Sequence, residues 1–525
     1  MGRLGLALAG LALCAPAVPA EPAPTEAGAL QRVVPLTYFQ GQPLVIGNRV
    51  QLLVDDFMVE DRWKLRRRTG PVSKYLGNPI MVVDKPWEDH ILHPHVIHDP
   101  TDGKYKMWYT CANWGAFFDP ARQAYYIAYA ESRDGFTWTK PELFPFEGHA
   151  RTNVVRFAPN RHVDRLNAYL NVRLNPDQSD PRRKYWASAG KRMTHAYSPD
   201  GVNWEIEGEP MLDYGSDFSN QILWVEETKQ WYMYLRPSNE LTATGVGVRT
   251  ASTLATIPEG NRHTRRRVSL STSPDLKHWS KPRVVLYPDE RDTPDFDVAL
   301  VFRRHDWFIG FYDPMYQEAG GGEQEIHLAT SRDGIHWQRT WDREPFVPRG
   351  PAGSWDHGHV SMGFAPPVEM GDNLLFYYTG SPVGQGPPLL GWESELGFGI
   401  FKMRKDRFVG HWAERDATGY LLTRQFILDG SRLRLNCLAP PKAYDQPDHG
   451  IFVEILQAPA SGAAMGAAPP VEGFTLADCD RIRVDQIDRL VTWRGKSDLS
   501  ALKGKAVYLR FQLKDAALYS FQIEP

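Results

Sequence analysis

Acidic residues and histidines stand just before several strand-like stretches of this 525-residue sequence. Carboxylates and imidazoles are the side chains that most often transfer protons in active sites. The segments "GSDFSNQILW", "TPDFDVALV" and "GSWDHGHVSM" carry them as Asp217, Asp297, Asp356, His357 and His359. We take the three aspartates as candidate catalytic residues and the two histidines as candidate substrate-binding residues.

A similar cluster occurs earlier, in "PWEDHILHPHV". Asp89 is a fourth candidate catalytic carboxylate, and His93 and His95 are candidate substrate-binding residues. Trp114, in the next loop, could stack on a bound ligand. The pair His93-x-His95 offers only two metal ligands, and no zinc-type Cys/His spacing accompanies it. The sequence therefore predicts no metal and no cofactor.

A structural interpretation of these carboxylates stays open, because an Asp before a strand often caps a turn by accepting backbone N–H bonds. Asp313 in "FYDPMY" follows the core of a strand, and we expect it to be a turn residue. Turn roles are also expected for acids that recur in each copy of a repeated segment, namely Asp134, Asp200, Asp275 and Asp333.

That repeated segment is Ser-x-Asp-Gly-x-x-Trp. It begins at Ser132, Ser198, Ser273 and Ser331, and the third copy has Leu276 in place of Gly, so its turn should differ slightly. Ser and Asp accept backbone N–H bonds across a tight turn, and Gly adopts the left-handed conformation that such a turn needs. The Trp is large enough to pack between neighbouring sheets.

An aromatic strand precedes each copy, and a fifth, "LLFYYTG", precedes "GFGIFKM" without the turn. Repetition of several strands per unit is typical of a propeller. We therefore predict an all-β protein with a five-bladed β-propeller over residues 50–412. Unrelated hairpins with a common turn, or six or seven blades, are the alternatives.

The character of the sequence changes near residue 413. Alternating strands such as "GIFVEILQ" and "KAVYLRFQLKDAALYSFQIEP" continue without the repeat. We predict a separate C-terminal β-sandwich over residues 413–525, as an accessory domain.

The N-terminus has the pattern of an export signal: Arg3, then "LGLALAGLALCAPAVPA" with small residues at its end. We predict a signal peptide over residues 1–20, a Pro/Ala-rich tether over 21–49, and a secreted or periplasmic protein. A lipid anchor at Cys14 is the alternative.

The apolar stretch at the N-terminus is too short to span a membrane. The net charge of −3 gives no reason to expect nucleic acid as a partner.

Three cysteines remain if Cys14 leaves with the signal: Cys111, Cys437 and Cys479. Cys437 and Cys479 both lie in the C-terminal region and could form a disulfide. Buried, unpaired thiols are the equal alternative.

The turn repeat and the domain order resemble the five-bladed propeller glycoside hydrolases of families 32, 43, 68, 117 and 130. The sequence is most similar to secreted family-32-like proteins of environmental bacteria, which end much as "DLSALKGKAVYLRFQLKDAALYSFQI" does. The resemblance implies that the first strands of the blades line a central funnel. It also implies an acid that protonates the leaving oxygen and a second carboxylate that attacks or activates water.

The sequence departs from family 32 in its first blade, where His93-Pro94 replaces the Asp-Pro of that family. The nearest carboxylates are Glu88 and Asp89. The Arg-Asp-Pro and Glu-Cys elements of family 32 are also missing from matching places.

The resemblance implies a secreted glycoside hydrolase that acts on a plant or algal oligo- or polysaccharide. A non-catalytic carbohydrate-binding propeller is the alternative, motivated by His93. The sugar, the stereochemical outcome and the oligomeric state are not legible in the sequence.

Overall fold

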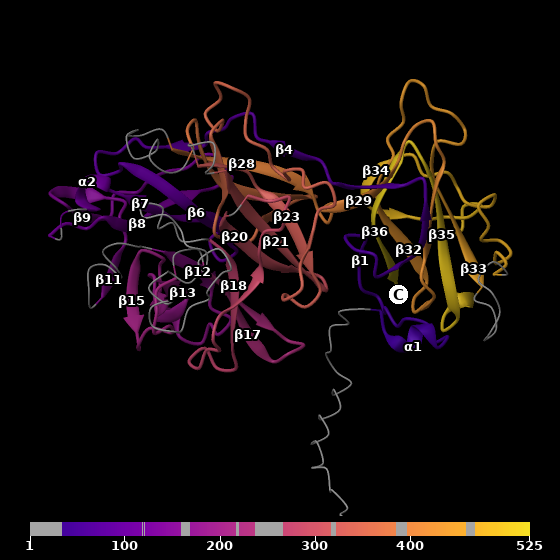
Figure 1. Cartoon of the computed structure of the whole chain (residues 1–525), viewed down its shortest axis with the longest axis horizontal. Coiled ribbons are helices and arrows are strands. Elements are labelled where there is room, and N and C mark those ends of the chain that lie inside the picture. Colours follow the sequence, from indigo (N-terminus) through magenta and orange to yellow (C-terminus); the bar gives the residue numbers. More distant parts are fainter. Residues whose placement is uncertain are drawn as a thin grey trace, which may run out of the picture.

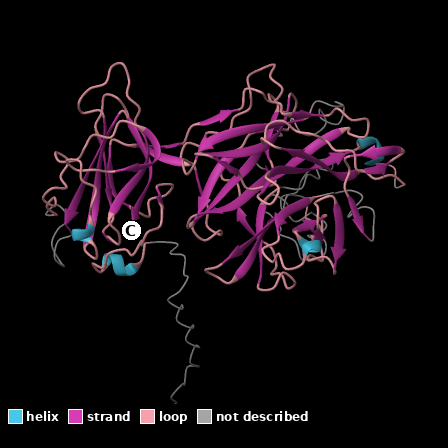
Figure 2. Cartoon of the chain, turned by 180° about the vertical axis from the view of Figure 1, so that it is seen from behind, coloured by secondary structure: helices cyan, strands magenta, loops and turns pink. Residues whose placement is uncertain are grey.

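The computed structural model describes residues 34–117, 119, 121–158, 169–216, 220–236, 266–293, 295–316, 322–384, 396–457 and 468–525. Almost all regular structure in these ranges is β-strand. The short helices are α1 (Leu36–Phe39), α2 (Trp114–Phe117) and the 3-10 turns Pro181–Arg183 and Ser500–Leu502. The predicted all-β class is confirmed. Figure 1 shows two lobes, and Figure 2 shows from behind that strands dominate both.

The larger lobe, which we call the repeat lobe, contains five successive strand sets. Set 1 is β6 (His90–Asp99), β7 (Lys104–Ala112) and β8 (Tyr125–Ser132). Set 2 is β12 (Leu170–Leu174), β13 (Tyr185–Ala189), β14 (Thr194–Ser198) and β15 (Asn203–Glu207), with β11 (Arg156–Ala158) parallel to β15. Set 3 is β16 (Gln221–Val225), β17 (Gln230–Leu235), β18 (Val268–Ser273) and β19 (Arg283–Leu286).

Set 4 is β20 (Asp295–Arg304), β21 (Trp307–Tyr316), β23 (His327–Ser331) and β24 (Gln338–Arg339). Set 5 is β25 (His359–Met362), β26 (Val368–Met370), β27 (Asn373–Ser381) and β28 (Gly397–Arg404). The short strand β22 (Glu323–Gln324) pairs with both β21 and β25 and so joins the two sets. A separate hairpin, β9 (Phe144–Phe146) and β10 (His149–Thr152), follows set 1.

The outer edge of set 5 is completed by strands from the beginning of the chain. β4 (Val72–Lys74) and β5 (Met81–Val82) both pair antiparallel with β28. Strands that precede set 1 in the sequence therefore finish the last set, which ties the two ends of the repeat lobe together.

The C-terminal lobe consists of two sheets that share one hydrophobic core. One sheet contains β3 (Arg66–Thr69), β29 (Val409–Ala413), β36 (Ala516–Glu524), β32 (Arg432–Leu438) and β34 (Asp485–Leu490), with β1 (Gln51–Leu52) on β36. The other contains β2 (Val59–Trp63), β30 (Gly419–Thr423), β35 (Ala506–Lys514), β31 (Phe426–Ile427) and β33 (Gly450–Gln457). Leu421 and Phe511 from one sheet and Leu433 and Phe521 from the other are fully buried.

Residues 51–69 form strands that pair with this lobe, although we predicted them as part of the propeller over residues 50–412. β1 pairs with β36, β2 with β30, and β3 with β29. Pairing between strands that lie more than 300 residues apart leaves no local pattern in the sequence. The predicted start of the propeller, residue 50, therefore rested only on the predicted end of the tether.

The repeated segment forms the expected turn. In the first copy, Asp134 Oδ1 accepts hydrogen bonds from the backbone N–H groups of Phe136 (2.8 Å) and Thr137 (2.7 Å). Ser132 Oγ accepts one from Gly135 N–H (2.9 Å), and Gly135 has φ of 79°. These bonds stabilise the charged carboxylate and lower the pKa of Asp134 to about 2.

Each of three turns is bound by an aromatic side chain of the neighbouring strand set. Trp108 of set 1 donates to Gly201 O (2.6 Å), Tyr234 of set 3 to Gly334 O (2.9 Å), and Tyr377 of set 5 to Gly135 O (2.9 Å). The repeat's own Trp packs on the same aromatic ring, with centroid distances of 5.9–6.3 Å for the pairs Trp138–Tyr377, Trp204–Trp108 and Trp337–Tyr234. The predicted packing of these tryptophans between sheets is confirmed.

The third turn keeps part of this geometry despite its Leu. Leu276 has φ of 65°, and its carbonyl oxygen accepts a bond from Trp279 Nε1 (3.1 Å), as Gly201 O does from Trp204 Nε1 (2.9 Å). In the other three copies the Gly N–H also donates to the Ser Oγ, and among the described residues Leu276 has no such bond to Ser273, so the turn differs slightly, as predicted. A side chain in the left-handed region costs about 1–2 kcal/mol, which the packing around Leu276 and Trp279 offsets.

Several ion pairs hold the lobes together, among them Arg404–Asp485 at 3.9 Å. Arg332 donates to both carboxylate oxygens of Asp55 (2.6 and 3.2 Å), and its guanidinium lies between the rings of Phe57 (3.9 Å) and Trp307 (4.2 Å). Arg49 pairs with Asp306 at 2.8 Å. Because Arg332 follows the first residue of the fourth repeat, this repeat also fixes the position of the C-terminal lobe.

Cys111, Cys437 and Cys479 are all buried free thiols. The alternative of a Cys437–Cys479 disulfide is therefore excluded. Cys479 is instead held by Val453 N–H, which donates to its sulfur at 3.3 Å.

We predict that Gly201→Ala destabilises the repeat lobe more than Gly208→Ala does. Both glycines have positive φ (85° and 76°), but a Cβ at Gly201 would lie 2.8 Å from Trp108 Cζ2, while at Gly208 nothing lies within 4 Å. The difference should be about 1–3 kcal/mol, the usual cost of overpacking. Urea unfolding followed by tryptophan fluorescence measures it, and equal losses for the two variants would contradict the role given to this turn.

Candidate active site

Asp297 lies near the start of β20, buried between strand sets 3 and 4. Its Oδ1 accepts from Arg236 at 2.5 Å and from Arg266, and its Oδ2 accepts from Gln324 at 2.8 Å. Arg236 follows β17 and Arg266 precedes β18, so two strand ends of set 3 converge on one carboxylate of set 4. Burial alone would raise the pKa of Asp297, but the two guanidinium groups and Gln324 outweigh it and hold the pKa well below its usual range.

Asp313 lies within β21, fully buried, on the strand that pairs with β20. Its Oδ2 accepts from Ser361 Oγ at 2.6 Å and from Met362 N–H at 3.1 Å. Its Oδ1 has no hydrogen-bond partner within the described ranges. Burial raises the pKa of Asp313 well above its usual range, the two bonds from set 5 oppose this only in part, and the charge of Asp297 raises it further.

The expectation that Asp313 is a turn residue was wrong, because β21 continues through Pro314 to Tyr316. The signal that could have found it is the length of the apolar run "WFIGFYDPMY", which is twice that of the shorter aromatic strands. Pro ends most strands, yet Pro314 faces Phe296 at an irregular part of the β20–β21 ladder, where a missing N–H is tolerated.

Asp297 and Asp313 are therefore two interacting carboxyl groups whose surroundings move their pKa values in opposite directions. The surroundings therefore favour the ionised form of Asp297 and the protonated form of Asp313. Such a pair can supply an acid and an anion at the same place, which is the arrangement found in sites of general acid–base chemistry.

His359 adjoins this pair. It lies at the start of β25, and its backbone pairs with Gln324, the residue that donates to Asp297. Burial lowers the pKa of His359 to about 4, against the opposing charge of Asp297. Both ring nitrogens lack a hydrogen-bond partner in the part of the chain that the structure describes. A neutral imidazole with free nitrogens is suited to bind a hydroxyl group of a ligand.

Asp356 is held elsewhere. Its Oδ2 contacts Lys74 of β4 at 2.6 Å and accepts from Tyr378 at 2.9 Å, and its Oδ1 accepts from Ser354 at 3.1 Å. Lys74 belongs to the strand that completes set 5, so Asp356 stabilises the closure of the repeat lobe. His357 is partly exposed, and its Nδ1 lies 3.2 Å from Gly350 O.

The first strand set supplies aromatic and imidazole groups rather than a free carboxylate. His93 stacks on Phe364 at 4.2 Å between ring centroids, which joins sets 1 and 5. His95 is buried, and its Nε2 lies 2.6 Å from Val172 O of set 2. Burial lowers the pKa of His95 to about 4. His95 therefore links two strand sets as a neutral side chain.

The structure gives no support for a role of the remaining candidates, Asp89, Trp114 and Asp217. Asp89 is partly exposed beside Cys111 and Tyr126, whose pKa values its charge helps to raise. Trp114 lies in α2, with its side chain outside the described part, and Asp217 lies wholly outside the described residues. The catalytic roles of Asp89, Asp217 and Asp356 stay predictions.

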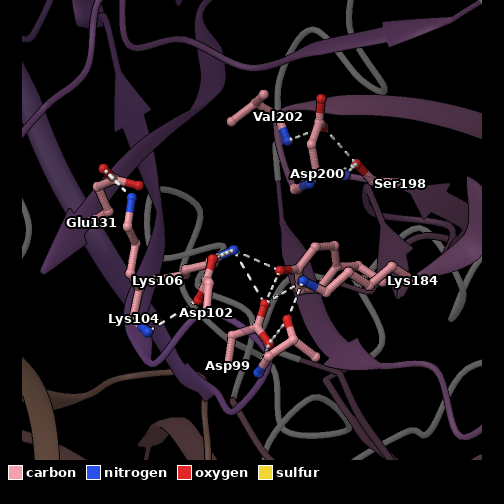
Figure 3. Close-up of polar contacts among 12 residues, drawn as sticks. Asp99, Asp102, Lys104, Lys106, Glu131, Lys184, Ser198, Asp200 and Val202 are labelled. Carbon is pink, nitrogen blue, oxygen red and sulfur yellow. Dashed lines mark hydrogen bonds and ion pairs between the residues drawn. The ribbon is translucent and has the colours of Figure 1, made fainter. Parts of the chain in front are cut away.

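Another buried acid, Asp99 at the end of β6, has a structural purpose. Figure 3 shows Lys106 and Lys184 directed at Asp99 from two strand sets, with nitrogen–oxygen distances of 3.2 and 2.7 Å. Thr101 donates to its other oxygen through both N–H (2.9 Å) and Oγ (2.7 Å). Although burial opposes it, these donors lower the pKa of Asp99 well below its usual range. Asp99 is an ionised link between sets 1 and 2.

Within the described ranges no group of His, Cys, Asp and Glu side chains is arranged to hold a metal ion. In the same ranges no helix is both long and apolar enough to cross a bilayer.

The sequence matches no family model and no curated protein. Among solved structures, the chain is similar to a β-1,2-mannobiose phosphorylase from Listeria innocua (14% identity, 63% of this chain and 96% of that chain, TM-score 0.41). It is also similar to the catalytic domain of a GH62 α-L-arabinofuranosidase of Coprinopsis cinerea (12%, 64% and 97%, 0.39) and to a glycosyl hydrolase from Bacteroides ovatus (12%, 63% and 94%, 0.40). At these scores the likeness supports no conclusion about this chain, and its resemblance to family 32 stays a prediction.

We predict that Asp313→Asn gains stability over the wild type as the pH rises. A raised pKa means that folded Asp313 keeps a proton that the unfolded chain releases above about pH 4, so the wild type loses stability between that pH and the folded pKa. The neutral Asn removes this loss. The melting temperature of Asp313→Asn minus that of the wild type should therefore increase from about pH 5 to about pH 8.

Asp134→Asn is the matched control. The lowered pKa of Asp134 contributes stability that is fully present above the unfolded pKa, so its difference from the wild type should stay constant over the same range. A flat difference for Asp313→Asn as well would show that Asp313 is ionised in the folded protein.

Proposed function

We propose that this protein is a secreted glycoside hydrolase that cleaves glycosidic bonds of a plant or algal oligo- or polysaccharide. The carrying observation is the pair Asp297 and Asp313, one held ionised by two arginines and the other held protonated by burial. Hydrolysis of a glycosidic bond needs an acid for the leaving oxygen and an anion near the sugar ring, and this pair supplies both.

We also infer that the five strand sets are the blades of a five-bladed β-propeller and that the two C-terminal sheets form a β-sandwich. Three features support the propeller: the order of the sets along the chain, the docking of turns on neighbouring sets, and the contact of set 5 with set 1 through Tyr377 and Gly135. Completion of set 5 by β4 and β5 supports a closed ring. The shared core of the C-terminal sheets supports the sandwich.

In this proposal Asp313 is the general acid. Its Oδ2 already accepts two hydrogen bonds, so the proton resides on Oδ1, which has no partner in the described ranges. The proton passes to the glycosidic oxygen, the bond from that oxygen to the anomeric carbon breaks, and the leaving group departs as an alcohol. Ser361 and Met362 N–H then stabilise the carboxylate that remains.

Asp297 stays ionised throughout and stabilises the positive charge that develops on the sugar ring. A water molecule adds its hydroxyl to the anomeric carbon and gives its proton to Asp313, which restores the starting state. Arg236 and Arg266 fix the orientation of Asp297, and neutral His359 binds a sugar hydroxyl. This scheme suits a separation of the two carboxyl groups of about 5 Å and gives retention; at about 6.5–9.5 Å Asp297 would instead take the proton of the water, which gives inversion.

A non-catalytic carbohydrate-binding protein is the second candidate. It is favoured by His93 in the place of an Asp and by the ion pair that neutralises Asp356. It predicts affinity for a glycan that survives the change of Asp297 and Asp313 to Asn, without turnover.

We predict that the purified protein releases sugar from at least one member of a panel of plant and algal glycans. Asp313→Asn should lower kcat about 10²–10⁴-fold, the usual contribution of a general acid. Because Asp313 must be protonated, activity should fall only on the alkaline side, as the pH passes its raised pKa. Reducing-end assays and a pH–rate profile measure both effects.

Asp134→Asn, in a turn far from the pair, should leave kcat unchanged. The second candidate would be favoured if the folded wild type releases no sugar and if the wild type and the Asp297→Asn variant bind a glycan with equal affinity. Full activity of Asp313→Asn would exclude Asp313 as the acid.

A further inference from the structure

A cavity lies between the lobes, with a volume of about 1050 Å³. One wall is formed by residues of β2 and β3 in the C-terminal lobe, and the other by β24 of set 4 and the loop after it. Its main polar and aromatic lining consists of Arg62, Arg66, Arg67, Arg68, Arg339 and Trp341. We call it the arginine groove.

The indole of Trp341 is 85% exposed, the highest value for any tryptophan described. Its backbone is nevertheless fixed, because Arg291 Nη1 donates to its carbonyl oxygen at 3.2 Å. An aromatic face held at the wall of a cavity and left uncovered offers a flat apolar platform of the kind that stacks on a ring-shaped ligand.

Five arginines and three acids, Asp56, Asp342 and Glu344, line the arginine groove. Arg68 is paired with Glu414, and Arg339 with Asp289 and Asp292, so the positive charge available to a ligand lies on β2 and β3. Arg62 and Arg67 share the single carboxylate of Asp56, so one positive charge of the three groups is not neutralised. Arg66 is exposed and has no ion pair in the part of the chain that is described.

Guanidinium groups suit ligands with carboxylate or sulfate groups, because their fork of N–H donors matches two oxygens at once. The ion pairs Arg332–Asp55 and Arg49–Asp306 hold its two walls in place, so the groove is formed before a ligand arrives.

We propose that the arginine groove binds an anionic polysaccharide, with Trp341 stacked on a sugar ring and Arg66 paired with its carboxylate or sulfate groups. The site is separate from Asp297 and Asp313, and its binding does not require hydrolysis. It would hold a charged polymer on the protein whether or not the same polymer is cut.

The test is isothermal titration of the full chain carrying Asp313→Asn, which removes the proposed acid. Oligogalacturonides probe carboxylates, sulfated carrageenan oligosaccharides probe sulfates, and cellohexaose is the neutral probe. We expect binding of at least one anionic probe, weakening as salt rises, and none of cellohexaose. Trp341→Ala and Arg66→Ala should each weaken binding about tenfold.

Trp63→Ala and Arg182→Ala are matched controls, since both side chains are exposed outside the groove, and both should bind as the parent does. Absence of binding to either anionic probe, or equal affinity of groove and control variants, overturns the proposal. Equal affinity for a short DNA duplex, with the same loss on Arg66→Ala, would replace a glycan by nucleic acid. A wild-type protein that releases no sugar from the glycan panel but binds the anionic probe would count against the proposed hydrolase alone.

Discussion

The hydrogen bond from a Tyr or Trp ring to the carbonyl oxygen of a left-handed turn residue determines how the strand sets of the repeat lobe meet. A residue with positive φ turns its carbonyl out of the sheet, where the side chain of the neighbouring set can reach it. Burial of two aromatic rings at each such contact makes the spacing rigid, because cores are packed as densely as crystals. Leu276 keeps a positive φ at the equivalent position of the third copy, where its carbonyl oxygen accepts from Trp279 of the same turn.

The site follows from that spacing. Once sets 3 and 4 are docked, the ends of β17 and β18 bring Arg236 and Arg266 against Asp297. Docking of sets 4 and 5 brings only Ser361 and a backbone N–H against Asp313. Two carboxyl groups on paired strands thus meet different neighbours, cationic on one side and uncharged on the other. The opposed pKa values are a result of the order of the strand sets and not of any local sequence feature.

The sequence was sufficient for features that depend on local chemistry. The Asp134 turn and the all-β class could be predicted because turn residues and strand alternation act over a few positions. Features that depend on residues distant in the sequence could not be predicted. Asp313 lies near Asp297 only because β20 and β21 pair through an irregular ladder. Asp356 forms an ion pair with Lys74 from the start of the chain, and residues 51–69 pair with strands near its end.

The buried acids of the repeat lobe differ in what surrounds them, and the difference bears on function. Asp99, Asp297 and Asp356 each contact at least one cation, as expected of a charge removed from water. Asp313 differs from these three, since the charged neighbour that shifts its pKa is another carboxylate. An Asn at this position could accept from Ser361 and Met362 without that repulsion, so stability alone does not explain an acid here. A carboxyl group that keeps its proton near neutral pH can give that proton away, which an amide cannot, and this capacity is what the surrounding structure preserves.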